Sequence, residues 1–270
     1  MTRAAGFGVV SIASLDVRRK PEHRAEMTSQ LLLGEIVRLG RRAGSGWVSI
    51  ENERDGYSGW VRDWGIVSCS RARAARWAGL ARHRVREAVA HATAERTGGA
   101  VVSPLFWNSV VIVERRQGGR SRVELPDGRR GWIASGVLAE HSARPPFLLD
   151  RVLSLMGVPY LWGGRTPAGF DCSGLVQQVL WEQGLRVPRD AAEQLRASKP
   201  LRDWREAGPG DLAFFGVPGE RVSHVGLMLG DGLYLHARGM VRLASLHRYN
   251  PLCDNQLLRQ FRVAGKLGAE

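Results

Sequence analysis

The stretch from Tyr160 to Leu180, YLWGGRTPAGFDCSGLVQQVL, constrains this 270-residue chain more than any other. It begins as a glycine-rich loop and passes, through the segment DCSG at residues 171–174, into an apolar pattern with helical spacing. Cys172 is therefore predicted at a helix N-terminus, where backbone N–H groups lack intrahelical partners and carry partial positive charge. Such a position favours a thiolate over a thiol, so we expect an activated nucleophile that loses its proton to a base, either during the reaction or already in a resting ion pair.

Two histidines downstream supply the groups that a nucleophilic cysteine needs. His224 lies in VSHVGLMLG and His236 in LYLHA, and both segments have the pattern of β-strands. A thiolate, an imidazole base and a second imidazole that orients the base make a cysteine hydrolase, assembled in space rather than in sequence. Taken singly, Cys172 is typical of a small buried hydrophobe and His236 of a satisfied core histidine.

The cysteine count argues against a disulfide framework and leaves a metal site as an alternative. Cys69, Cys172 and Cys253 are odd in number and widely spaced. A zinc ion held by Cys172, His224 and His236 is conceivable, because catalytic zinc uses three ligands and an open position. No CxxC or HExxH pattern accompanies these residues, so we expect neither a metal nor another cofactor.

Three segments in fixed order resemble the NlpC family of bacterial cell-wall cysteine peptidases. They are GVPYLWGGRTPAGFDCSGLV, PGDLAFF and SHVGLMLGDGLYLHA, and the resemblance covers roughly Phe147 to Val263. It implies a papain-like α+β core and cleavage of the bond between γ-D-glutamate and a diamino acid in peptidoglycan stem peptides. It also implies Cys172 as nucleophile, His224 as base, His236 as the orienting residue and Tyr160 as the tyrosine beside the nucleophile.

The N-terminal half contains a β-rich pattern that occurs twice. EIVRLGRRAGSGWVSIENERDGYSGWV and the later SVVIVERRQGGRSRVELPDGRRGWI share an Asp-Gly turn and a closing Gly-Trp. The first copy resembles a bacterial SH3-like domain, and an internal repeat of this kind implies two successive barrels. We predict barrels over residues 1–69 and 84–140, with a linker or helix over residues 70–83. RVREAVAHATAER fits a strand or a helix equally well.

The last part, residues 141–270, is predicted as the catalytic domain. HSARPP marks its start, because two prolines stop what precedes them. FLLDRVLSLMGVP predicts a short helix, and Asp171 to Gly184 a second one. Strands are predicted at LAFFG, HVGLMLG, GLYLHARG, MVRLAS and LLRQFRVAG. The expected fold is two all-β SH3-like barrels followed by an α+β papain-like domain.

Relatives that carry paired N-terminal barrels suggest how a substrate is chosen. In that subset the first barrel packs against the active site, so the enzyme is a dipeptidyl-peptidase on recycled murein peptides with a free N-terminal L-Ala. By position, Glu26 and Tyr57 match the residues that read the ammonium, and Asp190 matches an acid near the same amine.

Two residues beside the nucleophile complete the implied substrate contacts. Asp171 makes the site polar, and Ser173 is a candidate ligand for the α-carboxylate of D-Glu. Ala191 stands where relatives often carry a serine.

The charge and the apolar segments of the sequence indicate which binding partners and which cellular location to expect. The chain has 39 Lys and Arg against 26 Asp and Glu, a net charge of +13. This excess fits either an anionic partner or a basic background spread over solvated faces, and no nucleic-acid-binding motif accompanies it. The apolar run after Arg3 is typical of a strand rather than a signal peptide, and no apolar run is long enough to span a membrane. We therefore expect a cytoplasmic monomer that binds a murein peptide and no nucleic acid.

Three other functions remain compatible with parts of the sequence. The chain could be a secreted wall hydrolase whose barrels bind intact peptidoglycan. It could be a wall-binding module with an inactive peptidase domain, although Cys172, His224 and His236 are all present. An acyltransferase or amidase of the same superfamily, acting on lipids, would need a hydrophobic anchor that the sequence does not offer.

Overall fold

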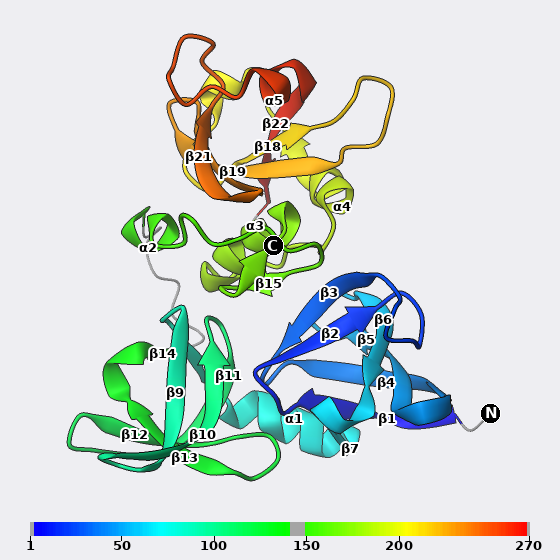
Figure 1. Ribbon diagram of the computed structural model, residues 1–270, viewed down its shortest axis with the longest axis vertical. Coiled ribbons are helices and arrows are strands. Elements are labelled where there is room, and N and C mark those ends of the chain that lie inside the picture. Colours follow the sequence, from blue (N-terminus) through cyan, green and yellow to red (C-terminus); the bar gives the residue numbers. More distant parts are fainter. Residues whose placement is uncertain (1–2, 141–148, 269–270) are drawn as a thin grey trace. The chain divides into compact units, whose positions relative to one another are not determined.

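The chain divides into an N-terminal unit, Met1–Ala143, and a C-terminal unit, Arg144–Glu270. The computed structural model describes residues 3–140 and 149–268. Figure 1 labels the elements of both units. The boundary predicted at HSARPP, residues 141–146, lies outside the described residues.

Short strands that alternate between buried and exposed side chains build the first sheet of the N-terminal unit. The strands follow the order β3-β2-β6-β5-β4-β1-β7, and neighbouring strands are antiparallel. Val10, Val17 and Val61 are among the side chains that fill its core. The strands are β1 (Arg3–Val10), β2 (Ser14–Arg18), β3 (Met27–Leu32), β4 (Ile36–Ala43), β5 (Trp47–Asn52), β6 (Ser58–Arg62) and β7 (Ile66–Cys69).

A second sheet repeats this arrangement seven strands later. Its order is β10-β9-β13-β12-β11-β8-β14, which matches the first order strand for strand. RVREAVAHATAER, which fitted a strand or a helix, contains β8 and β9. The strands are β8 (His83–Val85), β9 (Val89–Glu95), β10 (Gly98–Phe106), β11 (Val110–Gln117), β12 (Arg120–Glu124), β13 (Arg130–Ala134) and β14 (Leu138–Glu140).

Helix α1 (Arg71–Leu80) connects the two sheets. Ser70 caps it by accepting a hydrogen bond from the backbone N–H of Arg73. Trp77 is buried against residues of both sheets, and its indole N–H donates to the carbonyl of Gly34 at 3.0 Å. A Cβ on Gly34 would lie 2.4 Å from the carbonyl oxygen of Val110, so only glycine fits where the two sheets meet.

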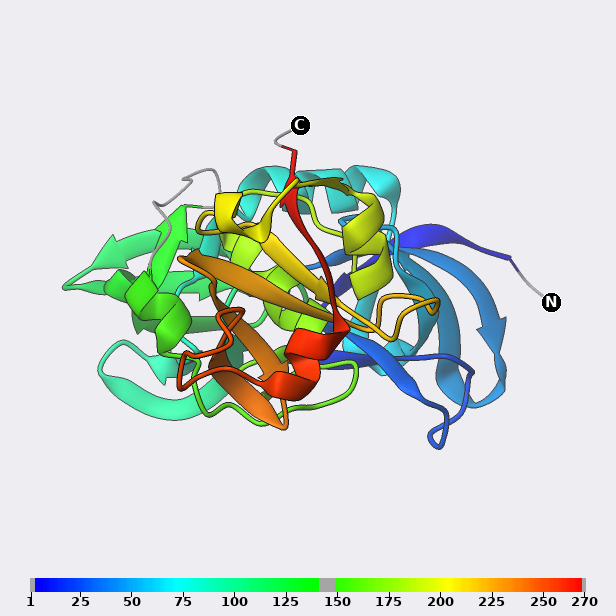
Figure 2. The same ribbon diagram turned by 90° about the horizontal axis from the view of Figure 1, so that it is seen from above.

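The C-terminal unit is built on an antiparallel sheet in the order β17-β22-β18-β19-β20-β21. Figures 1 and 2 show α3 and α5 on opposite sides of this sheet. Alternate side chains of the strands, including Phe215, Met228 and Tyr234, pack on the α5 side together with Leu257. The strands are β15 (Arg165–Thr166), β16 (Gly169–Phe170), β17 (Ser198–Pro200), β18 (Leu212–Phe215), β19 (His224–Gly230), β20 (Leu233–Arg238), β21 (Met240–Ser245) and β22 (Phe261–Leu267).

Most predicted elements of this unit are confirmed, and one is wrong in part. The helices are α2 (Leu149–Leu153), α3 (Cys172–Glu182), α4 (Ala191–Arg196) and α5 (Asn255–Gln260). LLRQFRVAG was predicted as one strand, but its first four residues belong to α5. Asp254 caps this helix, because its carboxylate accepts hydrogen bonds from the N–H groups of Gln256 and Leu257. Helix α4 was not predicted.

Candidate active site

Cys172 is the first residue of α3, and the loop before it is tied to the helix by one carboxylate. Asp171 caps α3 by accepting the N–H of Gly174 at 2.7 Å. Its other oxygen accepts the N–H of Gly163 at 2.9 Å. A Cβ on Gly174 would lie 2.2 Å from the carbonyl oxygen of Gly164, so the glycine loop packs directly on the helix start. These contacts fix the backbone that carries the thiol.

A buried arginine neutralises the carboxylate beside the nucleophile. Arg189 is 1% exposed, and its two terminal nitrogen atoms contact the two oxygens of Asp171 at 3.0 and 2.5 Å. Arg189 also donates to the hydroxyl of Ser173 at 2.9 Å, and that hydroxyl donates to Asp171 at 3.2 Å. The predicted substrate contacts Asp171 and Ser173 are thus engaged inside the protein, and their roles toward a substrate stay predictions.

The sequence reasoning missed Arg189, although it singled out the neighbouring Asp190. The only sequence signal is an arginine just before a short helix, in VPRDAAEQ, and a chain this rich in arginine offers many such positions. The sequence reasoning also missed Gln194, which lies on helix α4. Its amide donates to the carbonyl oxygens of Ser173 and Pro188 at 3.0 and 2.9 Å, so it holds α4 against the start of α3.

Burial opposes the thiolate that the helix N-terminus favours at Cys172. Burial raises the pKa of Cys172 to about 12, and the Asp171 carboxylate adds to the rise. Hydrogen bonds from the backbone N–H groups of Val225 and Ser173, and the charge of Arg189, lower this pKa by less. Loss of hydration therefore outweighs the helix N-terminus and favours the thiol as the resting group. The contact with Val225 places the sulfur beside the first residues of β19, where His224 lies.

The two predicted histidines meet at hydrogen-bond distance. His224 Nε2 lies 2.9 Å from His236 Nδ1, and the two rings are nearly perpendicular. Burial, followed by the charges of Arg238 and Arg242, lowers the pKa of His224 to about 4. Burial, followed by His224 and Arg242, lowers the pKa of His236 to about 3. Burial therefore favours neutral imidazoles at rest, and this opposes a resting ion pair with Cys172.

This geometry does not fit a zinc ion shared by the two facing nitrogen atoms. Nitrogen ligands about 2.0–2.1 Å from a tetrahedral zinc ion lie farther from each other than His224 Nε2 and His236 Nδ1 do. Among the described residues, no group of three or more His, Cys, Asp or Glu side chains could hold a metal ion.

Within residues 3–140 and 149–268, no helix is long and apolar enough to cross a membrane.

A charged cluster lies beside the histidine pair and was not predicted. Arg238 and Arg242 each donate to one oxygen of Asp254 at 2.8 Å. Arg242 lies directly opposite His236 in the β20–β21 ladder, so the two side chains share a face of the sheet. No sequence signal distinguishes these residues, because they come from separate segments of a strongly basic chain. Their net positive charge helps keep the imidazoles neutral.

Two further predicted residues lie in the catalytic unit with suitable properties. Tyr160 is half-buried, and burial together with the nearby Cys172 and Asp171 raises its pKa, so its hydroxyl stays a donor. Asp190 is half-buried at the start of α4 and makes no capping hydrogen bond there. Burial raises the pKa of Asp190 despite the neighbouring Arg189, so a bound cation would stabilise its charged form.

Glu26 and Tyr57 lie directly before strands β3 and β6 of the first sheet in the N-terminal unit. The carboxylate of Glu26, just before β3, contacts Arg19 at 2.7 Å. Tyr57 packs its ring against the core of the sheet and donates its hydroxyl to the carbonyl of Thr28 at 3.4 Å. The two residues therefore border the same strand, β3. Their role at a substrate amine stays a prediction.

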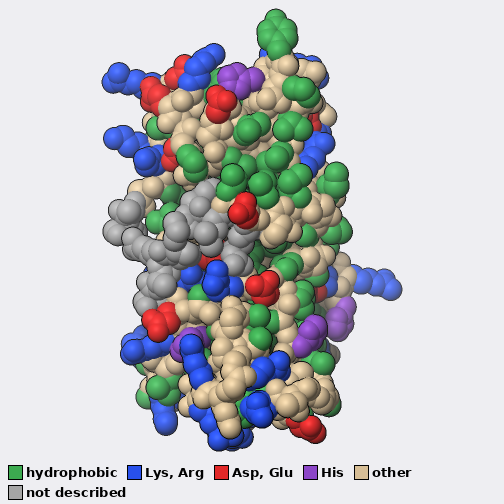
Figure 3. All heavy atoms as spheres, turned by 90° about the vertical axis from the view of Figure 1, so that its left-hand side faces the viewer, with side chains coloured by type: hydrophobic (Ala, Val, Ile, Leu, Met, Phe, Trp, Pro, Cys, Tyr) green, Lys and Arg blue, Asp and Glu red, His purple; other side chains and the backbone are tan. Residues whose placement is uncertain are grey.

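The catalytic unit exposes large hydrophobic side chains near the loop that carries Cys172. Leu161 and Trp162 belong to this loop, and Met240 pairs through its backbone with Pro159. Figure 3 shows hydrophobic side chains gathered on one face of this unit. An extended ligand with apolar parts has contact surface there.

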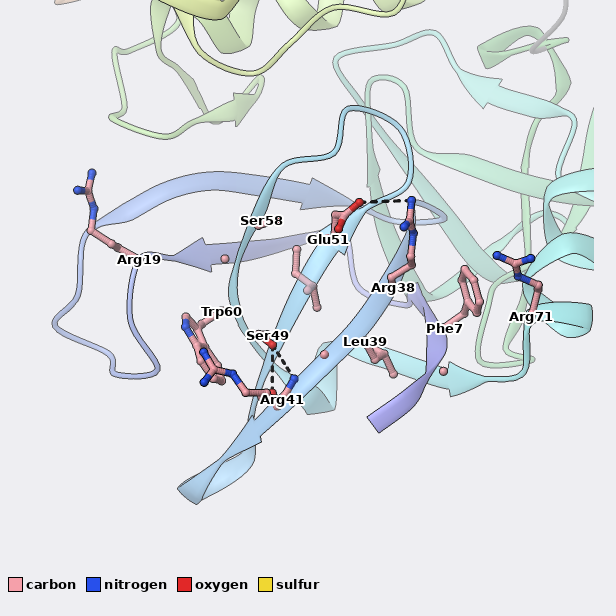
Figure 4. A pocket seen from close by; sticks show the side chains of 14 residues that line it. Phe7, Arg19, Arg38, Leu39, Arg41, Ser49, Glu51, Ser58, Trp60 and Arg71 are labelled. Atoms are coloured by element: carbon pink, nitrogen blue, oxygen red, sulfur yellow. Dashed lines mark hydrogen bonds and ion pairs between the residues drawn. The ribbon is translucent and has the colours of Figure 1, made fainter. Parts of the chain in front are cut away.

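The outer face of the first sheet carries a hollow of about 780 Å³ (Figure 4). Its lining includes the glycines Gly6, Gly40 and Gly59. Basic and aromatic side chains surround it, from β1, β4, β6, the residue after β2 and the start of α1. These are Phe7, Arg19, Arg38, Arg41, Trp60 and Arg71.

Comparisons with known proteins match both parts of the chain. Residues 157–259 match the model of the NlpC/P60 family, and residues 17–65 match that of the bacterial dipeptidyl-peptidase Sh3 domain. A gamma-D-glutamyl-L-lysine dipeptidyl-peptidase of Bacillus subtilis is 28% identical over 222 residues, covering 77% of this chain and 71% of the relative. Dipeptidyl-peptidase 6 of Lysinibacillus sphaericus is 34% identical over 158 residues, covering 54% of this chain and 55% of the relative.

A solved structure shares the whole architecture. An NlpC/P60 family protein from Bacillus cereus has a TM-score of 0.83 and 19% identity, covering 97% of this chain and 99% of its own. At this identity the likeness establishes the fold. Together with a buried cysteine at a helix N-terminus beside a histidine pair, the matches identify the chain as a cysteine peptidase with an NlpC/P60 domain and a bacterial dipeptidyl-peptidase Sh3 domain.

Proposed function

We propose that this protein is a cell-wall peptidase that cleaves the bond between γ-D-glutamate and the diamino acid in free murein stem peptides. It releases L-Ala-γ-D-Glu in the cytoplasm, as part of peptidoglycan recycling. The observation that carries the proposal is the hydrogen-bonded pair His224–His236 beside the helix that begins at Cys172. The presence of a dipeptidyl-peptidase Sh3 domain in the same chain supports the release of a dipeptide.

The acylation step follows from the neutral resting pair. Because His236 occupies Nε2 of His224, Nδ1 is the nitrogen left to take the proton of the Cys172 thiol. Proton transfer accompanies attack of the sulfur on the γ-carbonyl carbon, so the thiolate does not need to exist beforehand. The backbone N–H of Cys172 and the hydroxyl of Tyr160 are the proposed donors to the oxyanion. The amine of the diamino acid then leaves with the proton from His224, and a thioester remains.

Deacylation reverses the proton transfers with water. His224 accepts a proton from the water molecule that attacks the thioester carbon. The carbon–sulfur bond breaks, and Cys172 regains its proton from His224. The products are the dipeptide with a free γ-carboxylate and the unchanged enzyme. The proposed reaction consumes only the peptide and water and needs no oxidant, reductant or cofactor.

A free N-terminal amine is the proposed specificity element. An ammonium beside a half-buried carboxylate forms charge-assisted hydrogen bonds, and an acetylated amine leaves that carboxylate unpaired. The raised pKa of Asp190 supports its role as one such carboxylate. Glu26 and Tyr57 are proposed to read the same amine, as their match to the family positions implies.

The test compares L-Ala-γ-D-Glu-diaminopimelate with its N-acetylated form, using Cys172→Ala as the blank. Cleavage of the free peptide alone supports the proposal. Equal cleavage of both peptides would remove the amine requirement and with it the recycling role. The lysine peptide is run in parallel, because the Bacillus subtilis relative is named for L-lysine.

A matched pair of variants tests the contribution of Glu26. Glu26→Gln removes the charge proposed to read the amine, whereas Glu22→Gln removes an exposed charge from the same loop. We expect Glu26→Gln to lower kcat/KM for the free peptide by about 10-fold or more, because charge-assisted hydrogen bonds contribute roughly 1.5–3 kcal/mol. An equal effect of the two variants would assign the loss to general electrostatics.

We also propose that the second sheet is a second SH3-like barrel. Its strand order repeats that of the first sheet, and the Asp-Gly turn and Gly-Trp closure occur in both. The proposal predicts that residues 84–140 keep their strand ladders when expressed with α1. Loss of the β-sheet circular dichroism spectrum in that fragment would contradict it.

A second function is favoured by the hollow on the first sheet. Arg41 and Arg71 line it without an ion pair among the described residues, and Trp60 offers an apolar surface. These side chains suit an anionic sugar polymer, so a wall hydrolase whose first barrel holds intact peptidoglycan is the alternative. Co-sedimentation with insoluble wall fragments tests it, with Arg41→Gln and Trp60→Ala set against Arg76→Gln, an exposed arginine of α1 outside the hollow. Binding lost only in the first two variants supports the alternative.

A further inference from the structure

The contact between the two histidines fixes where each proton must lie for the proposed reaction. His224 can accept the thiol proton at Nδ1 only if its own proton is on Nε2. That proton is then donated to Nδ1 of His236, which lies 2.9 Å away. A neutral His236 that accepts at Nδ1 carries its proton on Nε2. The reactive state therefore needs an acceptor for the Nε2 proton of His236.

That proton lies deep inside the protein. His236 is 0% exposed, and its Nε2 atom has no hydrogen-bond partner among the described residues. Leaving a buried donor unpaired is costly, so the opposite tautomer, with the proton on Nδ1, competes. In that tautomer His236 donates to His224 Nε2, and His224 Nδ1 carries a proton and cannot act as a base.

The neighbouring Tyr234 has a buried hydroxyl group that also lacks a hydrogen-bond partner among the described residues. Tyr234 lies two residues before His236 on β20, so both side chains point to the same face of the sheet. Their ring centroids are 5.3 Å apart. Tyr234 is also 0% exposed, and its hydroxyl oxygen has no hydrogen-bond partner in the described ranges. Burial raises the pKa of Tyr234, so the group remains a neutral hydroxyl with free lone pairs.

The charged groups around His236 do not offer the same acceptor. Arg238 on β20 and Arg242 on β21 can only donate hydrogen bonds. Asp254 already accepts from both arginines and from the backbone N–H groups that begin α5. His224 is engaged at the other side of the ring, and Asp171 is held by Arg189.

We infer that Tyr234 is a positioning residue for the reaction: its hydroxyl oxygen accepts the Nε2 proton of His236 through one bound water, and so selects the reactive tautomer of both histidines. The inference rests on the proposed function, because it concerns the base of that reaction. Tyr234 does not touch the substrate or Cys172 in this role. It acts through His236 on His224.

The first measurement is of proton position and needs no substrate. Long-range ¹H–¹⁵N spectra of the ¹⁵N-histidine-labelled protein report which ring nitrogen is protonated. In the wild type we expect Nε2 protonated in both histidines, and in Tyr234→Phe a rise of the Nδ1-protonated form. Tyr249→Phe, at a residue 94% exposed, is the control and should match the wild type. Identical spectra for Tyr234→Phe and the wild type would overturn the inference.

The second measurement uses the peptide assay and a double variant. Tyr234→Phe should lower kcat by about 10- to 100-fold with KM changed less than about two-fold, since only the reactive tautomer is lost. In a His236→Gln background, which lacks the Nε2 proton, Tyr234→Phe should change kcat by less than about two-fold. An equal loss in both backgrounds would assign Tyr234 to packing and overturn the inference. If the wild type does not cleave the peptide, the proposed function fails, and the spectra still decide the role of Tyr234.

Discussion

His224 and His236 face each other across adjacent strands, with Nε2 of the first 2.9 Å from Nδ1 of the second. This contact leaves Nδ1 as the free nitrogen of His224, on the ring edge opposite His236. It also makes the second histidine an orienting group rather than a second base, because its Nδ1 faces His224 and its ring is fully buried. His224 and His236 therefore have different roles although they are the same residue type, because they differ in burial and position.

Replacing His236 tests this division directly. His236→Ala removes the acceptor for the His224 proton, so we expect kcat/KM to fall by about 10²–10⁴-fold. His236→Gln should retain more activity than His236→Ala, because an amide oxygen can accept the same hydrogen bond. Peptide hydrolysis by the two purified variants measures the difference. Equal activity of the Gln and Ala variants would show that hydrogen bonding at this position does not orient the base.

The acidic limb of the pH–rate profile is a second test. His224 must be neutral to accept the thiol proton, and its pKa is lowered to about 4, so kcat/KM should fall only as the pH drops toward 4. An unperturbed imidazole would give a limb near pH 6.5. On the alkaline side, the amine of the substrate loses its proton near pH 8, and the proposed contact with Asp190 predicts a second decline there. The N-acetylated peptide, if it is cleaved at all, should lack that second decline.

The same lowered pKa values predict how stability depends on pH. Each histidine binds a proton in the unfolded chain below about pH 6.5, but in the folded protein only near pH 4 or 3. The unfolded state therefore binds more protons in this window, and the free energy of unfolding should fall as the pH drops from 6.5 to 4. The slope is at most about 1.4 kcal/mol per pH unit for each histidine. Urea titrations of the wild type and of a His224→Asn, His236→Asn double variant should differ by this slope, and parallel curves would contradict it.

Local patterns predicted the parts of the site that depend on short segments. Cys172 at a helix start follows from the DCSG segment and the apolar spacing after it, and the structure places a capped helix there. His224 and His236 were expected on strands, and they lie on β19 and β20. In each case the deciding residues lie within a few positions of the one predicted. The contact between the two histidines required the tertiary fold.

Properties that depend on distant contacts were missed or wrongly predicted. The thiolate at Cys172 was inferred from the helix end alone, but burial, which only the packed unit produces, raises the pKa of the thiol. Arg189 lies far along the chain from Asp171, and nothing near Arg189 marks it as the partner. The start of α5 was read as strand because LLRQ is apolar enough for either, and the capping carboxylate of Asp254 decides the outcome.

The ion pair of Arg189 with Asp171 predicts a large loss of stability when one partner is removed. Arg189→Met leaves a buried carboxylate without its counter-charge, and such changes cost roughly 3–5 kcal/mol. The control is Arg196→Met, which breaks an exposed pair with Glu193 and should cost less than about 1 kcal/mol. Denaturant unfolding of both variants measures the contrast. In an Arg189→Met, Asp171→Asn double variant, part of the loss should be recovered, and no recovery would mean that the charge on Asp171 is not the cause.

The close approach of the glycine loop to α3 predicts a size limit at Gly174. A Cβ there would lie 2.2 Å from the carbonyl oxygen of Gly164, and backbone cannot move aside as a flexible side chain can. Gly174→Ala should therefore cost about 1–3 kcal/mol and lower kcat as well, because the shift moves the first turn of the helix that carries Cys172. Gly208→Ala is the control, since a Cβ at that position has no neighbour within 4 Å. Thermal unfolding and peptide hydrolysis of both variants should separate them, and a Gly174→Ala enzyme as stable and active as Gly208→Ala would mean that the loop does not hold the nucleophile in place.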